Sequence, residues 1–417
     1  MKNFLIFLFV SSFIFAADAT FSIEKGGDAR KSIAIIEAND SLGGSKGDTL
    51  YSILLADMKV SGHFLPSKEK LQGDFHSTVI PANLKSYQYI LKYKLTTEAG
   101  LSLYVALYNA SNGSAVFQKS YNMNTQSKYP FLVHKAISDI NDALNLESIE
   151  WINRYVIFSR YTEPRKSEIV LADYTLNYQK TIIKGGLNLF PKWGDKDQQS
   201  FYYTSFSGNL PTLYRLNIYN GKKDAVATSA GMLVCSDVSE NGEKILATMA
   251  PEGQPDIYEI DVMSGAKKRI TNFGGIDVGG RYVDDESRII FVSNRLGYAN
   301  IFKQSINGSS VVPVVNRGKN NNQCDAFGDK IVYASRETSS ASSGNTFNLY
   351  LANSNGGNVY PLTASGENQY PRFSTNGKVV LFVKNSRETS QIGYINLETK
   401  QSELFALNGK KVQSIDW

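Results

Sequence analysis

The chain has 417 residues and a formal net charge of +5, and 42% of its residues are hydrophobic. It is too long for one ordinary hydrophobic core, so two domains are expected. Because charges of both signs are mixed and no basic run occurs, nucleic acid is not expected as a partner.

Residues 1–19 are expected to be a signal peptide. Lys2 precedes an apolar run over residues 4–15, which is too short to span a bilayer comfortably. The small residues on either side of Asp18 then offer a cleavage site, so the mature chain would begin at Thr20. No other long apolar stretch follows, and we therefore expect a secreted or periplasmic protein whose mature chain has no transmembrane segment.

Residues 20–31 are expected to form an N-terminal interaction arm. Residues 20–23 are amphipathic, and Gly26 and Gly27 after them form a natural hinge. Such an arm can dock on its own protein or add as a strand to a partner, and it can equally be a fixed edge strand of the first domain.

The rest of residues 20–147 is expected to fold as an α+β domain. Residues 32–37 have the composition of a strand. Apolar residues recur at helical spacing over residues 50–58, and Gly62 marks the end of that helix.

Three apolar segments and a second helix complete the predicted domain. The segments at 87–96, 101–110 and 116–123 predict an antiparallel meander. Pro130 then begins a helix, because proline suits the first helical turn.

Residues 148–417 repeat one pattern about every 44 residues. One position of the repeat is an apolar or aromatic residue that comes just before a short polar segment. Its six copies are Val170, Tyr214, Tyr258, Phe302, Tyr350 and Tyr394. A second set of repeat positions keeps the same period: Trp151, Trp193, Val238, Tyr282, Phe327, Phe373 and Trp417. Such repeats, rich in short strands, are typical of an all-β propeller with one four-stranded blade per repeat, and here they predict six blades.

The two ends of this region resemble each other. Residues 148–151 read SIEW and residues 414–417 read SIDW. We expect residues 413–417 to enter the first blade as its inner strand, because that pairing would close the propeller and remove an exposed sheet edge.

The sequence assigns no catalytic residue, metal ligand or cofactor. His63, His76 and His134 all lie in the first domain, none has a recognisable metal-binding spacing, and no G-x-S-x-G motif occurs. A competing interpretation is a secreted propeller hydrolase or lyase in which carboxylates converge on the axis, with or without Ca²⁺. The candidate carboxylates are Asp237, Asp277, Asp284 and Asp325. A glycan-binding module of the cell wall is a further alternative.

Cys235 and Cys324 occupy equivalent positions in alternate repeats. Positions so far apart exceed the separation of about 7 Å between Cα atoms that a disulfide allows, so two unpaired thiols are expected.

One face of the predicted propeller collects residues suited to hydrogen-bonding a partner. Connectors between blades and loops after each second strand emerge on the same side, since neighbouring strands are antiparallel. This loop face is predicted to carry Gly274, Gly275, Asp277, Asn320, Asn321, Asn322, Asn368 and Gln369. Plain turn chemistry also accounts for these residue types.

The mature chain resembles the TolB family of the Tol-Pal system over its whole length. The resemblance rests on propeller segments such as PDIYEIDVMSGAKKRIT, on LLADMKVSGHFLP and HKAISDINDAL before the propeller, and on FSIEKGGDARKSIAII near the N-terminus. One departure is the apolar connector at residues 230–233, which is more polar in the family.

The resemblance implies a non-enzymatic periplasmic scaffold that acts as a monomer. In this family the propeller binds the peptidoglycan-associated lipoprotein and the N-terminal segment binds TolA. The system supports outer-membrane integrity and constriction during cell division and serves bacteriocin import. Other outer-membrane proteins are a further class of partner that the resemblance suggests. Carried over to this chain, the loop face would bind the lipoprotein, and the TolA contacts would be Phe21, Ile23, Glu24, Gly26, Asp28 and Arg30.

Overall fold

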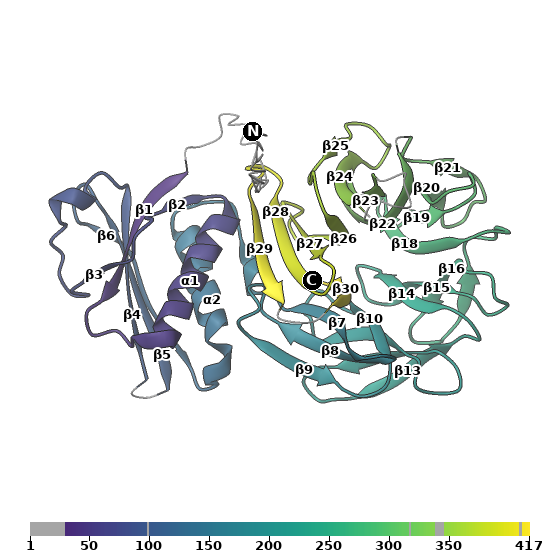
Figure 1. The fold of residues 1–417 in the computed structure, drawn as a ribbon, viewed down its shortest axis with the longest axis horizontal. Coiled ribbons are helices and arrows are strands. Elements are labelled where there is room, and N and C mark those ends of the chain that lie inside the picture. The colour runs from purple at the N-terminus through teal and green to yellow at the C-terminus, as the bar shows by residue number, and fades with distance from the viewer. Residues whose placement is uncertain (1–29, 98–99, 317, 338–345, 408–410) are drawn as a thin grey trace, which may run out of the picture.

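A computed structural model describes residues 30–97, 100–316, 318–337, 346–407 and 411–417. The chain forms a smaller lobe of helices and strands and a larger lobe of strands (Figure 1). The helices of the smaller lobe lie between its sheet and the larger lobe, so they form the layer that joins the two.

The smaller lobe contains a mixed sheet in the order β2-β1-β4-β5-β6, with β3 also paired to β1. Its strands are β1 (Lys31–Ala38), β2 (Phe64–Pro66), β3 (Leu71–Gly73), β4 (Tyr89–Thr96), β5 (Leu101–Asn109) and β6 (Ala115–Met123). The meander β4-β5-β6 is antiparallel as predicted. The parallel pairing of β1 with β2, β3 and β4 was not predicted.

Two long helices cover one face of this sheet. They are α1 (Gly44–Ser61) and α2 (Tyr129–Ala143), with short 3-10 helices at Ala82–Leu84, Gln126–Lys128 and Glu150–Asn153. Gly62 ends α1 in a left-handed conformation with φ 78°, and Pro130 lies in the first turn of α2, so both predicted boundary signals are confirmed.

The larger lobe consists of consecutive antiparallel sheets. The first sheet holds β7 (Val156–Glu163), β8 (Lys166–Ala172) and β9 (Gln179–Ile183). The second holds β10 (Asn188–Trp193), β11 (Ser200–Ser205), β12 (Thr212–Asn217) and β13 (Lys223–Thr228). The third holds β14 (Leu233–Val238), β15 (Lys244–Met249), β16 (Asp256–Asp261) and β17 (Lys267–Arg269). The fourth holds β18 (Asp277–Val283), β19 (Arg288–Ser293), β20 (Asn300–Ser305) and β21 (Val311–Pro313).

Strands β22 to β29 form one eight-stranded sheet of two antiparallel units that meet through a single residue pair, Phe347 and Glu367. The first unit holds β22 (Lys319–Phe327), β23 (Lys330–Arg336), β24 (Phe347–Asn353) and β25 (Tyr360–Pro361). The second holds β26 (Glu367–Phe373), β27 (Val379–Asn385), β28 (Ser390–Asn396) and β29 (Ser402–Leu407).

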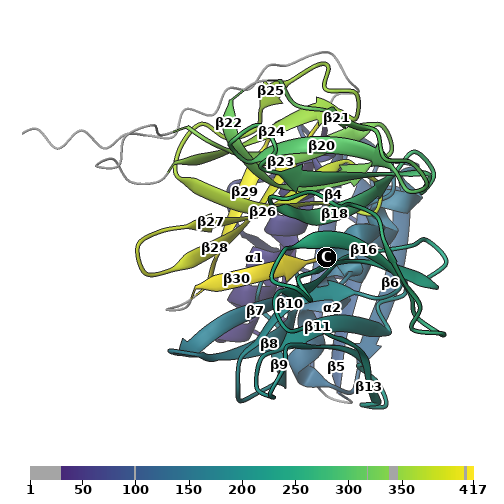
Figure 2. The same ribbon diagram turned by 90° about the vertical axis from the view of Figure 1, so that its right-hand side faces the viewer.

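The last strand, β30 (Val412–Asp416), pairs with β7 and completes a four-stranded sheet in the order β30-β7-β8-β9. Segments from the two ends of the larger lobe therefore lie side by side, with β30 close to β7 and β10 (Figure 2). Strands β10, β14, β18, β22, β26 and β30 contact one another in turn around an axis.

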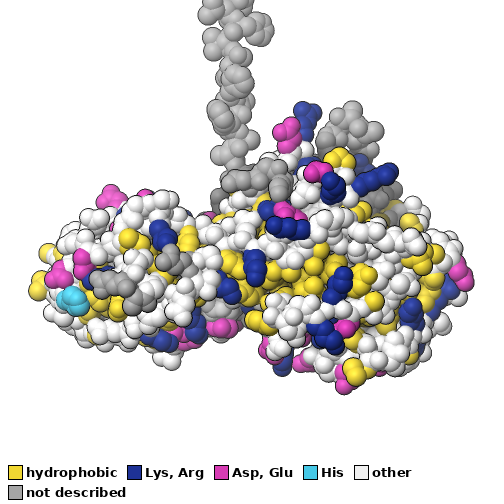
Figure 3. Space-filling model, turned by 90° about the horizontal axis from the view of Figure 1, so that it is seen from below, with side chains coloured by type: hydrophobic (Ala, Val, Ile, Leu, Met, Phe, Trp, Pro, Cys, Tyr) yellow, Lys and Arg dark blue, Asp and Glu magenta, His cyan; other side chains and the backbone are white. Residues whose placement is uncertain are grey.

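The two lobes share one hydrophobic core. A single buried cluster joins Leu54 of α1 and Ile137 of α2 to Tyr174, Tyr394 and Trp417 of the larger lobe. Separate clusters lie between successive sheets, because each sheet is covered by its neighbours. On the face seen from below, hydrophobic side chains gather on the larger lobe near the narrowing between the lobes (Figure 3).

Candidate partner-binding face and charged axis

The predicted loop face lies where strands β18, β22 and β26 begin. Asp277 is 0% exposed, and its Oδ2 accepts a bond of 3.0 Å from Nη2 of Arg295. The Arg295 guanidinium also lies over the rings of Phe273, Phe291 and Phe302. Asp277 therefore holds the loop after β19 in place and is not itself a surface that a partner can reach.

Two asparagines of the predicted face have the same supporting role. Asn321 is 0% exposed and its amide donates to Oδ1 of Asn300 over 2.9 Å. Asn368 is 1% exposed and donates to the backbone oxygens of Phe347 and Ser365, each over 2.9 Å. These asparagines bond to the connectors beside them.

The other predicted residues of this face are more accessible. Gly274 and Asn320 are exposed, and Gly275, Asn322 and Gln369 are partly exposed. A Cβ on Gly275 would lie 2.3 Å from Oδ1 of Asn294, so glycine is required there by close packing.

Four exposed apolar side chains on the loop face were not predicted. Leu210 follows β11, Leu296 follows β19, and Met232 and Ile276 end the connectors before β14 and β18. Their exposed fractions are 45%, 52%, 40% and 46% in that order. Each of these residues could have been found in the sequence as an apolar residue within a loop of this face. Met232 also belongs to the apolar connector at residues 230–233, which is more polar in the family that the sequence resembles.

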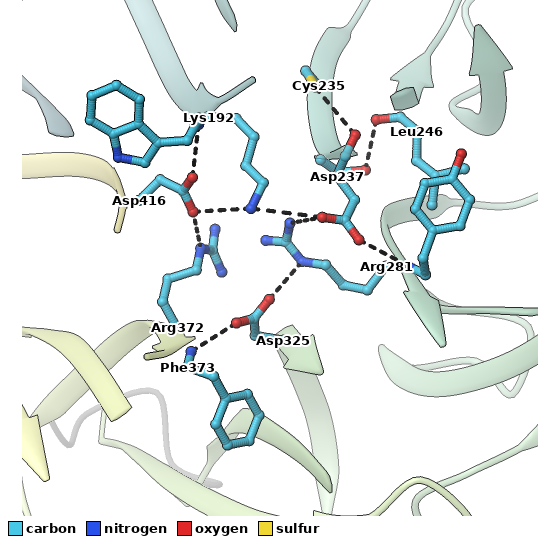
Figure 4. Close-up of polar contacts among 12 residues, drawn as sticks. Lys192, Cys235, Asp237, Leu246, Arg281, Asp325, Arg372, Phe373 and Asp416 are labelled. Carbon is cyan, nitrogen blue, oxygen red and sulfur yellow. Dashed lines mark hydrogen bonds and ion pairs between the residues drawn. The ribbon is translucent and has the colours of Figure 1, made fainter. Parts of the chain in front are cut away.

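Six charged residues of alternating sign meet around the axis (Figure 4). Each comes from the strand nearest the axis in its sheet or four-stranded unit, and in order they are Lys192, Asp237, Arg281, Asp325, Arg372 and Asp416. We call this set the charged axis. All but Asp325 directly precede one of the second repeat positions, which is the sequence signal that would have found them.

The charged axis is held by ion pairs and backbone bonds. Asp416 Oδ1 lies 3.1 Å from Nζ of Lys192 and 3.3 Å from Nε of Arg372. Asp325 Oδ1 lies 3.2 Å from Nε of Arg281. Asp237 Oδ1 lies 3.7 Å from both Nζ of Lys192 and Nη1 of Arg281. Each carboxylate also accepts a backbone N–H from a neighbouring sheet or unit, at Trp193, Tyr282 or Phe373.

These contacts control the protonation of Asp416. Burial alone would raise the pKa of its carboxyl, but Lys192, Arg372 and Arg281 together lower that pKa below its ordinary value. The carboxylate is therefore held in its charged form by the cations of neighbouring strands.

The four carboxylates of the enzyme alternative do not converge. Asp237 and Asp325 lie on the axis and pair with cations of the protein, whereas Asp277 pairs with Arg295 on the loop face. Asp284 follows β18 at the opposite face and pairs with Lys303 over 2.7 Å. Within the described residues, no three His, Cys, Asp or Glu side chains are grouped as a metal ion would require.

Both cysteines are buried and unpaired, as predicted. Burial raises the pKa of both thiols, that of Cys324 to about 12. They are therefore protonated and poorly reactive near neutral pH.

Comparison with known proteins identifies the family. Residues 153–417 match the family described as the TolB beta propeller domain. The Tol-Pal system protein TolB of Wolinella succinogenes is 42% identical over 420 residues, covering 99% of each chain, and that of Helicobacter hepaticus is 37% identical, again covering 99% of each. The chain belongs to the TolB family. The crystal structure of TolB from Acinetobacter baumannii has a similar fold, with a TM-score of 0.77 at 23% identity over 93% of this chain and 97% of that one.

Other features predicted for a TolB-family chain are described only in part. Of the predicted TolA contacts, Arg30 directly precedes β1 and is partly buried, and Phe21, Ile23, Glu24, Gly26 and Asp28 lie outside the described residues, as does the predicted signal peptide. None of the helices in the described part of the chain is long and apolar enough to cross a membrane.

Proposed function

We propose that this chain is a non-enzymatic periplasmic scaffold of the Tol-Pal system. In this proposal, residues 20–147 form the arm-bearing domain and residues 148–417 form a six-bladed propeller closed by β30. The loop face of the propeller binds the peptidoglycan-associated lipoprotein, and the arm at residues 20–31 binds TolA. The protein thereby supports outer-membrane integrity and constriction during division.

The observation that carries this proposal is the loop face itself. Leu210, Met232, Ile276 and Leu296 expose apolar surface on loops whose positions are fixed by buried residues such as Asp277. Exposed apolar side chains on rigid loops suit the binding of a protein surface, since little ordering is needed on association. The axial carboxylates are paired with cations of the chain, which leaves the loops as the chemically available surface.

A matched pair of substitutions tests the assignment of the face. Met232→Lys places a charge on the loop face, and Met263→Lys makes the same change at a residue that is 91% exposed in the β16–β17 turn, on the opposite face. We expect Met232→Lys to weaken binding of the purified periplasmic domain of the lipoprotein at least about tenfold in calorimetry, or about 1.4 kcal/mol, and Met263→Lys to leave it unchanged. Equal affinities for both variants would exclude this face.

Deletion of residues 20–28 tests the second binding region. We expect the shortened mature chain to lose binding to the periplasmic part of TolA and to keep its affinity for the lipoprotein, because the loop face lies on the other domain. Retention of TolA binding by the shortened chain would place that contact elsewhere.

A further inference from the structure

A second cluster of buried charges joins the two lobes. It consists of Asp57 on α1, His134 on α2 and Asp173 in the turn between β8 and β9, and all three are 0% exposed. His134 Nδ1 lies 2.9 Å from both carboxylate oxygens of Asp57, and its Nε2 lies 3.3 Å from Oδ2 of Asp173. The imidazole therefore bridges a carboxylate of the smaller lobe and a carboxylate of the propeller.

Each carboxylate is held in place by further bonds. The hydroxyl of Tyr174 donates to Oδ1 of Asp57. Asp173 accepts the backbone N–H groups of Thr175 and Tyr178, and the Thr175 hydroxyl as well. Asp173 is thus fixed within its own turn. Its contact with His134 therefore connects α2 to this turn of the propeller.

The two carboxylates favour the protonated imidazole. Burial alone would lower the pKa of His134, but the attraction of Asp57 and the hydrogen bond to Asp173 raise it to about 9. A neutral imidazole would leave two buried carboxylates without a cation between them. The titratable groups that face the cluster from the packed elements are Asp57, Asp173, Tyr129, Tyr174 and Tyr394.

We propose that His134 is a positioning residue whose imidazolium fixes the orientation of the arm-bearing domain on the propeller, and that loss of its proton releases this orientation. The inference concerns the contact between the lobes and does not depend on which partners the protein binds. It differs from a purely structural role because it requires the charge of His134 and not only its shape.

The start of strand β1 is connected to α2 as well. The backbone N–H of Lys31 donates to the oxygen of His63 over 2.8 Å, and His63 Nδ1 lies 2.6 Å from Oδ1 of Asn141, two turns after His134 on α2. The start of strand β1 is therefore tied to α2 through His63, so a change in the orientation of α2 would be felt at β1.

The sign of the pH dependence follows from the direction of the shift. Because the pKa of His134 is raised above its unfolded value of about 6.5, its contribution is complete below that pH and is lost as the pH rises through about 9. The orientation should hold through neutral pH and relax in alkali.

The test measures the distance between the lobes in the full mature chain. Spin labels at Ser86→Cys in the smaller lobe and Met263→Cys in the propeller report that distance, and the native cysteines are buried and should not react. The chain is compared with His134→Gln and with His76→Gln, the same change at an exposed histidine of the smaller lobe. The imidazole signals of histidine-labelled protein are followed by NMR from pH 5 to 10.

We expect one narrow distance distribution at pH 7 for the parent and for His76→Gln, and a broad one for His134→Gln. In the parent, the distribution should broaden with the same midpoint, about pH 9, at which the NMR signal of His134 titrates. If His134→Gln does not fold, the parent protein alone tests the proposal, because the midpoint of the distance change and the midpoint of the His134 NMR titration should coincide. A narrow distribution in His134→Gln, or a His134 titration without any change in distance, would overturn the proposal.

Discussion

The charged axis of the propeller and the cluster at the domain junction both bury charge, but they balance it differently. The axis pairs three cations with three carboxylates, and the side chains of Lys192 and Asp237 remain 17% and 20% exposed. The junction places one imidazole between two carboxylates, and none of the three is exposed. The axis is neutral with every group in its ordinary charge state, whereas the junction depends on keeping one proton.

This difference determines the pH at which each cluster loses its balance of charge. Removing one charge from a buried pair leaves its partner uncompensated, which is costly in either place. At the axis, Asp416 loses its charge in acid, below its ordinary pKa, because the neighbouring cations lower that pKa. At the junction, His134 loses its charge in alkali, and burial raises the pKa of Asp57. Alkali should therefore act on the contact between the lobes through His134.

The largest expected effect is that of Asp416→Asn in the strand that pairs with β7. The amide keeps an acceptor for the N–H of Trp193 but leaves Lys192 and Arg372 without their shared carboxylate. We expect the free energy of unfolding in urea to fall by about 3 kcal/mol.

Asp224→Asn is the matched control. Asp224 pairs with Lys222 over 3.2 Å on the surface, with 55% of its side chain exposed. Its loss should cost less than about 0.5 kcal/mol. Equal costs for the two variants would mean that the axis contributes no more than a surface ion pair.

The strands of the propeller were predictable because their signal is local and repeated. Apolar second strands such as β11 and β19 follow from composition, and the turns between strands from glycine and asparagine. The alternation of charge at the axis was missed because Lys192 and Asp237 lie about 44 residues apart, and only the propeller brings them together. The alternating charges are present in the sequence, mostly at the residues just before the second repeat positions. No rule based on neighbouring residues indicates that these charges form ion pairs with one another.

In the smaller lobe the non-local contacts were again the part that the sequence did not predict. The meander β4-β5-β6 is joined by short turns, whereas the parallel pairing of β1 with β4 spans a helix and two short strands. On the loop face, residue type alone does not separate a partner-binding role from a structural one, because small polar residues suit both a partner and a connector. Burial separates the two roles. Asp277, Asn321 and Asn368 are buried, so they support the connectors of the loop face.

A smaller effect is expected in acid, where the axis should lose the contribution of Asp416. Lys192, Arg372 and Arg281 lower the pKa of the buried Asp416, so its contribution is present above the unfolded pKa of about 4 and is lost as the pH falls through the lowered value. We expect the difference in urea midpoint between the parent and Asp416→Asn to be constant from pH 5 to 7 and to narrow below about pH 4. A difference that stayed constant in acid would assign the effect of Asp416→Asn to packing and not to charge.

A last expected effect concerns the reactivity of the thiols beside the axis. Cys235 and Cys324 are each 3% exposed, and Sγ of Cys235 donates to the backbone oxygen of Asp237 over 3.5 Å. Neither thiol should react with an aromatic disulfide reagent at pH 8 in the folded parent, and both should react in denaturant. Because the reaction requires opening of the sheets, Asp416→Asn should accelerate it by about 100-fold, the factor that corresponds to about 3 kcal/mol, while Asp224→Asn should not. An unchanged rate in Asp416→Asn would mean that the thiols become accessible by a local motion that does not involve the charged axis.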